Sequence, residues 1–292
     1  MQDLLQVLVS GLTLAAMYAL SAVGLSLCWG SMNVLNMAHG AIMVVGGYVC
    51  YSAATFLGSG GPASFAMALA AGAAMGALLY LVLVRPLRQR KGFETLIIIA
   101  SFGLGLIIEN LILKTYGAYP IAQPIALEGG WAFEQVFVPY QNAVVLASSS
   151  LILIVLALFL GRTRTGRAIR ATSISAPAAQ LQGVPVRRIY LLVMMLSGSL
   201  AAASGVLLST LTTLAPTMGY DPMLKAFIVC VAAGLGNASG ALFVALLLGV
   251  FEAAVGFYLG VRFGFSFLLA LVILSLIWRP SGLFGGKDLQ RL

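Results

Sequence analysis

Three ionisable side chains stand inside apolar stretches of this sequence, and they are the candidates for chemistry. They are His39, Glu109 and Glu252, and His39 is the only histidine among the 292 residues. A metal site or an acid–base catalyst needs clustered ligands, but the sequence contains no HExxH motif and no pair of histidines. It has no GxSxG nucleophile motif, and residues 282–288 only distantly resemble a phosphate-binding loop. We therefore expect no enzyme activity, no metal, no cofactor and no nucleotide site in this chain.

The apolar stretches around these residues have the length and composition of membrane spans. Hydrophobic residues make up 61% of the chain and the mean hydropathy is +1.05. We predict an all-α, polytopic transmembrane protein of about 8 to 9 spans, including broken or re-entrant helices, in one domain over residues 1–292. The first span has no basic segment before it, which indicates a retained helix rather than a cleaved signal. The predicted spans cover residues 4–29, 41–57, 63–84, 95–113, 142–160, 190–214, 223–235, 241–260 and 263–278.

A polar break follows the first predicted span, at residues 30–40. It carries Asn33, Asn36 and His39 and ends at Gly40. Irregular backbone at membrane depth is tolerated only where protein or a water-filled cavity surrounds it. The break therefore predicts a discontinuous helix beside a solute pathway, with a short polar turn at the membrane interface as the alternative.

Glu109 and Glu252 are the two acidic residues inside predicted spans. A buried ionisable group must be paired, neutral or hydrated, so both are candidates for a pathway lining or an ion pair. The alternative for Glu109 is a position at the outer interface beside Lys114, and for Glu252 a hydrogen-bonded structural role. The sequence leaves these alternatives open. Cys28, Cys50 and Cys230 lie in apolar stretches without a CxxC motif, and we expect them to be packing residues.

Residues 161–190 form a polar segment between two apolar runs. The segment holds six of the sixteen basic residues and no acidic one, which is typical of a cytoplasmic loop. Ser175 as N-cap, Pro177 in the first turn and Gly183 as a left-handed terminator predict a short helix within it. Such a short helix is marginal on its own, so it requires a partner surface.

The basic residues also orient the chain in the membrane. Residues 85–91, 162–188 and 279–291 hold four, six and three basic residues, thirteen of the sixteen, and alternating spans place all three segments on one side. That side is predicted to be cytoplasmic, with the N-terminus outside. Membrane orientation and anionic lipid explain the pI near 9.7, so we do not expect nucleic acid as a partner. The two halves of the chain show only faint similarity, which does not establish an internal repeat.

Four blocks of sequence together resemble a known family over essentially the whole chain. They are MYALSAVGLSLCWGSMNVLNMAHGAIMVVGGY, the pattern of Ala178, Ala179 and Gly183, GLGNASGALFVALLLGVFE, and the terminal RPSGLFG. The chain resembles the first permease subunit of branched-chain amino acid ABC importers, a group that includes urea and short-amide permeases. Pro177 and Ala41 stand where members of that group usually have an acidic residue.

The resemblance implies a function and a set of partners. The chain would be the transmembrane permease of an ATP-driven importer in the bacterial inner membrane, for a branched-chain amino acid, urea or a short amide. Its partners would be a homologous second permease in a heterodimer, two ATP-binding subunits that hold the ATP, an extracytoplasmic solute-binding protein, and membrane lipid. The same spans could also build a stand-alone channel or facilitator, which is the alternative.

Site residues follow from combining the resemblance with the polar residues. The solute pathway is expected to include Asn33, Asn36, His39, Gly40 and Glu252. The loop over residues 161–190 is expected to couple to the ATP-binding subunits through its short helix. The arginines before that helix either meet acidic residues of those subunits or serve orientation and lipid contact. The coupling residues are expected to be Arg167, Pro177, Ala178, Ala179, Leu181 and Gly183.

Overall fold

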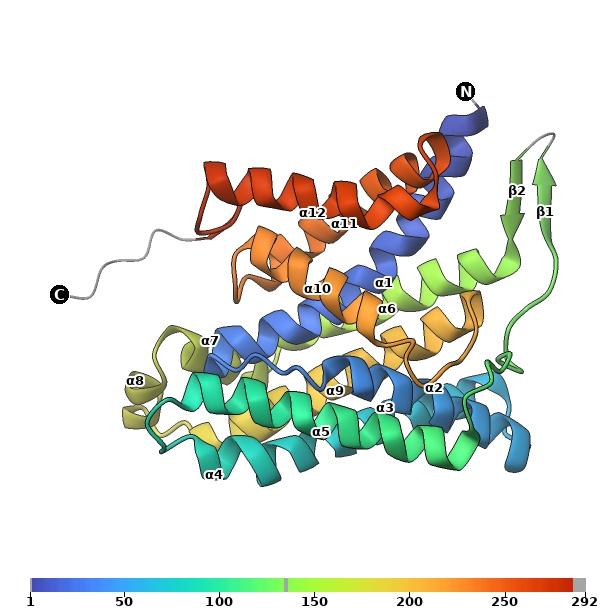
Figure 1. Cartoon of the computed structure of the whole chain (residues 1–292). Coiled ribbons are helices and arrows are strands. Elements are labelled where there is room, and N and C mark those ends of the chain that lie inside the picture. The colour runs from blue at the N-terminus through green and yellow to red at the C-terminus, as the bar shows by residue number, and fades with distance from the viewer. Residues whose placement is uncertain (1, 134–135, 286–292) are drawn as a thin grey trace.

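The computed structural model describes residues 2–133 and 136–285, and helices dominate it (Figure 1). A π-helical turn, η1 (Tyr80–Val84), joins α3 to α4. A single hairpin of β1 (Gly130–Phe133) and β2 (Val136–Pro139) pairs Trp131 with Val138. The helices are α1 (Gln2–Met32), α2 (His39–Phe56), α3 (Gly61–Leu79), α4 (Arg85–Leu87), α5 (Phe93–Tyr116), α6 (Tyr140–Arg162), α7 (Arg164–Ile174), α8 (Ala176–Leu181), α9 (Val186–Leu211), α10 (Tyr220–Ala233), α11 (Ala238–Tyr258) and α12 (Val261–Trp278).

The all-α membrane fold is confirmed, with a slightly smaller number of full spans than predicted. Seven helices of the described chain are long and apolar enough to cross a membrane, against the predicted 8 to 9. The difference lies in α2, which has 18 residues but is less apolar than the counted helices, and in α10, which has only 14 residues. Both are preceded by non-helical chain. The predicted loop at residues 85–91 also begins later than expected, because the helix continues through η1 and α4 to Leu87.

The two short helices belong to matching arrangements in the two halves of the chain. The long helix α1 is followed by non-helical residues 33–38 and then α2, and the long helix α9 by residues 212–219 and then α10. The N-terminal ends of α2 and α10 meet, since a Cβ on Gly40 would lie 2.6 Å from the carbonyl oxygen of Gly219. A Cβ on Gly219 would in turn collide with the carbonyl oxygen of Gly40. The structure thus contains a repeat that the sequence does not establish.

Small residues allow the long helices of the two halves to pack closely. Helix α1 of the first half lies along α11 of the second half, and helix α3 of the first half lies along α9 of the second half. These two contacts are equivalent if α1 corresponds to α9 and α3 corresponds to α11, as in the repeat. A Cβ on Gly72 would collide with the carbonyl of Gly198, and a Cβ on Gly249 would lie 2.5 Å from the backbone nitrogen of Ala15. Close backbone approach through small residues is the usual way in which membrane helices associate.

One end of the molecule carries the basic segments. Figure 1 shows α4, α7, α8 and the C-terminal end of α12 at the left, and the N-terminus and the β1–β2 hairpin at the far right. This arrangement agrees with the predicted grouping of the basic loops. Residues 286–292 of the predicted basic tail lie outside the described residues.

Two of the sequence blocks that carry the family resemblance pack against each other at this end. The backbone nitrogens of Leu283 and Phe284 donate to the carbonyls of Ala232 and Ala233, at 2.8 and 3.0 Å. The side chain of Asn237 donates to the carbonyl of Phe284 at 3.0 Å. The RPSGLFG block therefore closes over the turn between α10 and α11.

The opposite end is covered by residues 117–133 and 136–139. The buried side chain of Gln123 donates to the carbonyl of Gly47 at 2.8 Å and to the hydroxyl of Ser209 at 2.9 Å. Ile121 forms an antiparallel bridge with Leu214 in the non-helical segment before α10. This segment therefore holds the ends of α2 and α9 together.

Candidate functional site

The break between α1 and α2 is a tight turn with its own hydrogen bonds. Asn33 adopts a left-handed conformation with φ of 53°, which asparagine tolerates better than most residues, and its side chain is exposed. Asn36 is buried, and its side-chain oxygen accepts from the backbone nitrogen of Ala38 at 3.1 Å. His39 is fully buried and its Nε2 lies 3.1 Å from the hydroxyl of Ser21 on α1. Among the described residues, Nδ1 of His39 has no hydrogen-bond partner.

Gly40 lines a small pocket where the N-terminal ends of α2 and α10 meet. Glu109 on α5 and Tyr220 at the start of α10 line the same pocket. Glu109 therefore lines an inter-helix pocket, and among the described residues it forms no ion pair with Lys114. The pocket volume is ≈ 20 Å³, enough for about one water molecule and too small for a solute in this conformation.

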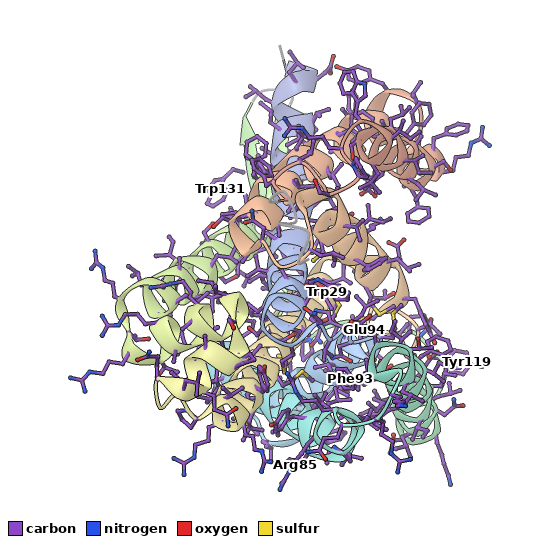
Figure 2. All side chains as sticks on the ribbon, turned by 90° about the vertical axis from the view of Figure 1, so that its left-hand side faces the viewer. Trp29, Arg85, Phe93, Glu94, Tyr119 and Trp131 are labelled. Atoms are coloured by element: carbon purple, nitrogen blue, oxygen red, sulfur yellow. The ribbon has the colours of Figure 1, made fainter. Side chains whose placement is uncertain are left out.

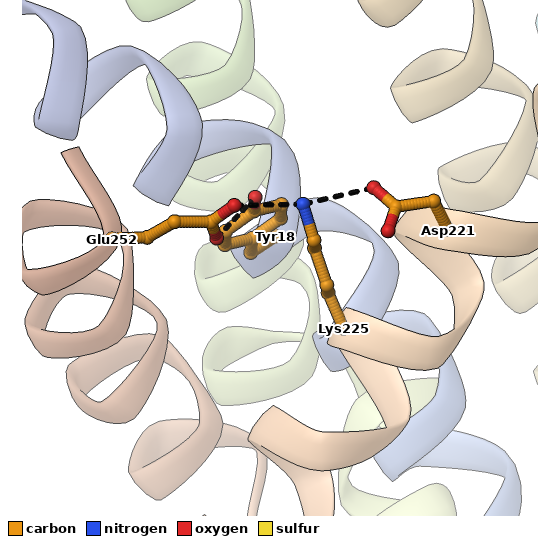
Figure 3. Close-up of polar contacts among 4 residues, drawn as sticks. All are labelled: Tyr18, Asp221, Lys225 and Glu252. Carbon is orange, nitrogen blue, oxygen red and sulfur yellow. Dashed lines mark hydrogen bonds and ion pairs between the residues drawn. The ribbon is translucent and has the colours of Figure 1, made fainter. Parts of the chain in front are cut away.

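Figure 3 shows a buried ion-pair network that includes Tyr18 on α1. Tyr18 lies about one helical turn from Ser21, the residue that contacts His39. The ammonium of Lys225 on α10 lies 2.7 Å from Oε1 of Glu252 on α11 and 2.8 Å from Oδ2 of Asp221. The hydroxyl of Tyr18 on α1 donates to Oε2 of Glu252 at 2.7 Å. Lys225 and Glu252 are 11% and 13% exposed, whereas Asp221 is 66% exposed. The network joins three helices and leaves one carboxylate accessible.

All four residues of this network line one pocket of ≈ 580 Å³. That volume falls within the roughly 300–1,000 Å³ that is usual for small-molecule sites. The remaining wall is largely apolar and includes Leu14, Met17, Leu208 and Phe257. This pocket has room for an amino acid, whereas the small pocket beside Gly40 does not.

The five predicted pathway residues do not converge on one cavity. Gly40 lines the small pocket and Glu252 the large one, while His39 packs between helices and Asn33 lies at the turn. That all five border the path stays a prediction. Lys225 was not among the predicted site residues, although the spacing of Asp221 and Lys225 by four residues was a usable signal for an ion pair on a helix.

The polar segment at residues 161–190 contains two helices, one more than predicted. Helix α7 begins at an N-cap formed by Thr163, whose hydroxyl accepts from the backbone nitrogen of Gly166 at 2.9 Å. Its arginines, including Arg167, are exposed, while Ile169 is buried. Helix α7 therefore presents a basic face away from the protein.

The predicted short helix is confirmed as α8, with the predicted caps. The hydroxyl of Ser175 accepts from the backbone nitrogen of Ala178 at 3.3 Å. Gly183 has φ of +80°, and the backbone nitrogen of Val184 donates to the carbonyl of Ala179 at 3.0 Å, which is the hydrogen bond of a Schellman terminus.

The contacts of α8 correct one part of the expected coupling surface. Ala179 is 5% exposed and packs against its own chain, so its side chain is not presented to a partner. Leu181 is 89% exposed, and Pro177 and Ala178 are also exposed. The burial of Ala179 depends on how α8 packs against α7 and α9, which the local sequence does not specify.

A basic groove runs beside α8. It is lined by four arginines, and its volume is ≈ 1050 Å³. One of them, Arg88, donates to the hydroxyl of Tyr190 at 2.8 Å and stacks over its ring at 4.1 Å. Figure 2 looks onto this end of the molecule and shows Arg85 pointing outward at the rim. The arginines are Arg85, Arg88, Arg187 and Arg188.

Comparison with known proteins places this geometry in a family. Residues 7–277 match the family model described as branched-chain amino acid transport system / permease component. The chain belongs to this family. It is a multi-span membrane permease, and the RPSGLFG block and the NMAHG part of the first block lie at turns between helices.

Individual relatives cover nearly the whole chain. It is 30% identical to the high-affinity branched-chain amino acid transport system permease protein BraD of Pseudomonas aeruginosa, over 99% of this chain and 98% of BraD. It is 28% identical to LivH of Escherichia coli K12, over 99% of this chain and 97% of LivH. It is also 26% identical to LivM of the same organism, over 93% of this chain and 68% of LivM.

One solved structure is similar in fold. It is PsaBC from Streptococcus pneumoniae in complex with Fab, with a TM-score of 0.51 over 91% of this chain and 90% of that chain. The sequence identity is 14%, so this likeness concerns the arrangement of the helices alone.

Proposed function

We propose that this chain is the membrane-spanning permease subunit of an ATP-driven importer, and that its solute is a branched-chain amino acid. The family and the printed names of BraD and LivH support the solute class. Urea and short amides, which the sequence resemblance leaves open, are neutral and would not require the buried ammonium of Lys225. The pocket that contains Lys225 therefore favours an amino acid.

The proposed assembly pairs this chain with a homologous second permease. Its similarity to both LivH and LivM, two permease proteins named for the same transport system in one organism, supports a heterodimer. Two ATP-binding subunits would bind the ATP, and an extracytoplasmic binding protein would deliver the solute. The assembly would lie in the inner membrane of a bacterium, in contact with its lipids.

The observation that carries the ATP-driven part of the proposal is the exposed surface of α8. A six-residue helix gains little stability by itself, yet both of its ends are capped and its side chain Leu181 projects almost completely from the protein. An apolar side chain so exposed at the cytoplasmic end suits a groove on another protein. We assign α8 as the helix that docks on an ATP-binding subunit, with the basic groove and Arg167 facing acidic residues around that contact.

Replacement of Leu181 by Asp tests this assignment. Leu181→Asp removes the apolar contact without affecting the packing of Ala179, so we expect a folded permease that retains much less ATP-binding subunit on purification. The matched control is Ile174→Asp, because Ile174 is 79% exposed at the end of α7. Equal retention of the ATP-binding subunits by the wild type and Leu181→Asp would contradict the docking role of α8.

A second pair of variants changes the terminus of α8 instead of its surface. No atom lies within 4 Å of a Cβ built on Gly183, so Gly183→Val acts only through its φ of +80°, which β-branched residues resist. The control is Gly161→Val, at an equally open position in helix α6. We expect only Gly183→Val to weaken retention of the ATP-binding subunits.

A further inference from the structure

The network around Lys225 consists of a fixed part and an exchangeable part. Both oxygens of Glu252 are engaged, one by Lys225 and the other by the hydroxyl of Tyr18. These three side chains are mostly buried, so they hold one another in place. Asp221 is 66% exposed, and an exposed ion pair contributes little to stability. A solute can therefore displace Asp221 from Lys225 much more readily than it can displace Glu252.

The ammonium of Lys225 has hydrogen-bonding capacity for a solute. An ammonium has three N–H donors, and the hydrogen bonds to Glu252 and Asp221 use two of them. The third donor can donate to a solute carboxylate. Once Asp221 has moved, the donor that it occupied can do so as well. Asp221 is then free to accept from an ammonium group of the same solute.

The charges of the network select for a solute that carries both groups. Lys225, Glu252 and Asp221 together carry one negative charge, so a carboxylate alone meets net repulsion. An ammonium alone can pair with Asp221, but it leaves Lys225 paired with Glu252 alone when Asp221 moves. A zwitterion replaces the Lys225–Asp221 contact with two new ion pairs and adds no net charge. A neutral amide offers neither ion pair.

The walls of the pocket suit an aliphatic side chain. Leu14, Met17, Leu208 and Phe257 line the pocket around the network, and its volume of ≈ 580 Å³ accommodates a solute of amino-acid size. The polar groups lie together on α10 and α11, so a bound amino acid would place its charged end there and its side chain against these apolar residues.

We propose that Lys225 and Asp221 form a binding site for the ammonium and carboxylate groups of an α-amino acid, with Glu252 and Tyr18 positioning Lys225. The site rests on the proposed transport function and names the groups that recognise its solute. Lys225 receives the solute carboxylate, and Asp221 receives the solute ammonium. The apolar wall receives the side chain.

A cysteine reporter in the pocket tests the site in the whole transporter. Gly256 lines the pocket, and the nearest atom to a Cβ built there is 4.0 Å away, so Gly256→Cys fits without a clash. The reporter is placed in a background in which Cys28, Cys50 and Cys230 are replaced, and the assembled complex is reconstituted in liposomes without ATP. The rate of modification by a water-soluble thiol reagent is then measured with leucine, 3-methylbutanoate, 3-methylbutylamine or acetamide present.

We expect leucine to slow the modification, and the other three compounds to have little effect at equal concentration. Lys225→Met and Asp221→Asn should each raise the leucine concentration for half-maximal protection by about tenfold or more, as expected when one partner of a desolvated charge pair is removed. Lys225→Arg should retain protection. The matched controls Lys114→Met and Asp3→Asn, at exposed positions, should leave protection unchanged.

Several results would overturn the proposal. Absence of modification without solute would show that the pocket is closed to water. Equal protection by acetamide and leucine, or unchanged protection in Asp221→Asn, would show that the ion pairs do not select the solute. Asp221 is exposed, so this last variant remains informative if Lys225→Met does not assemble.

Uptake measured in the same liposomes separates this site from the proposed function. ATP-dependent leucine uptake that continues while protection is absent would refute the site alone. Protection that is intact while uptake does not depend on ATP would refute the ATP-driven function and leave the site standing.

Discussion

Glu252 shows how one side chain can serve both roles that its position in a span suggests. It is hydrogen-bonded on both oxygens, which satisfies the structural requirement for a buried carboxylate, and it also lies on the wall of a solute-sized pocket. The sequence predicted that this acid is important, because burying a carboxylate in an apolar span costs free energy. It could not predict the partners Tyr18 and Lys225, because helix packing brings these residues together across 234 and 27 positions of sequence.

Tyr18→Phe measures how far the hydroxyl of Tyr18 stabilises this network. The variant removes one hydrogen bond to a charged group and should lower the free energy of unfolding by roughly 1.5–3 kcal/mol. Unfolding of the purified protein in mixed micelles measures the change, with Tyr119→Phe as the control because Tyr119 is 86% exposed. In a double-mutant cycle, Tyr18→Phe should cost much less in a Glu252→Gln background. Additive effects would contradict a coupled pair.

Local signals in the sequence were reliable where a single turn of backbone decides the structure. Ser175 and Gly183 terminate α8 as expected, since a cap depends on its immediate neighbours. The burial of Ala179 and the ion pairs of Lys225 could not be predicted, because their surroundings come from other helices. The same reason explains why Gly40 and Glu252 line two different pockets, and why Asn33, Asn36 and His39 line neither of these two.

At the scale of elements, the two short helices α2 and α10 are the feature that most distinguishes the fold from a simple bundle. The polar break at residues 30–40 predicted the first of them. The second follows residues 212–219, which lack a comparable cluster of Asn and His, so no polar break marks it in the sequence. The match between the two became visible only in the reciprocal contact of Gly40 and Gly219.

Enlarging either of these glycines should push the two short helices apart. Gly40→Ala and Gly219→Ala place a Cβ against the backbone of the opposite helix end, and such overpacking typically costs about 1–3 kcal/mol. The control is Gly103→Ala on α5, where no atom lies within 4 Å of the added Cβ. We expect a lower unfolding midpoint for the first two variants only. If Gly40→Ala were as stable as Gly103→Ala, the close contact of α2 with α10 would be wrong.

The missed helix α7 has a compositional cause. Its N-cap Thr163 and its three arginines lie in a segment so rich in arginine that the composition is typical of a solvated loop. Its apolar face consists of only a few residues, such as Ile169. Helix formation there depends on packing against α1, α6 and α9. The sequence therefore predicted the position of this polar segment but not its full helical content.

At the scale of the whole molecule, the general architecture follows from composition because the bilayer imposes it. Apolar length determines the spans, and the basic loops predict which side is cytoplasmic. Two of the membrane helices are also largely exposed within this chain. Only 17% of the most apolar stretch of α6, and likewise of α12, is buried. These helices must face lipid or a second permease, as a subunit of a larger assembly requires.

The central claim is that this permease moves an amino acid only when ATP-binding subunits act on it. The most direct measurement is uptake of labelled leucine into liposomes that contain the purified complex with its binding protein, compared with liposomes that contain this chain and the second permease alone. We predict uptake that requires ATP and the ATP-binding subunits and falls sharply with Leu181→Asp but not with Ile174→Asp. Leucine uptake at the same rate without ATP or without those subunits would contradict the account and favour a stand-alone channel.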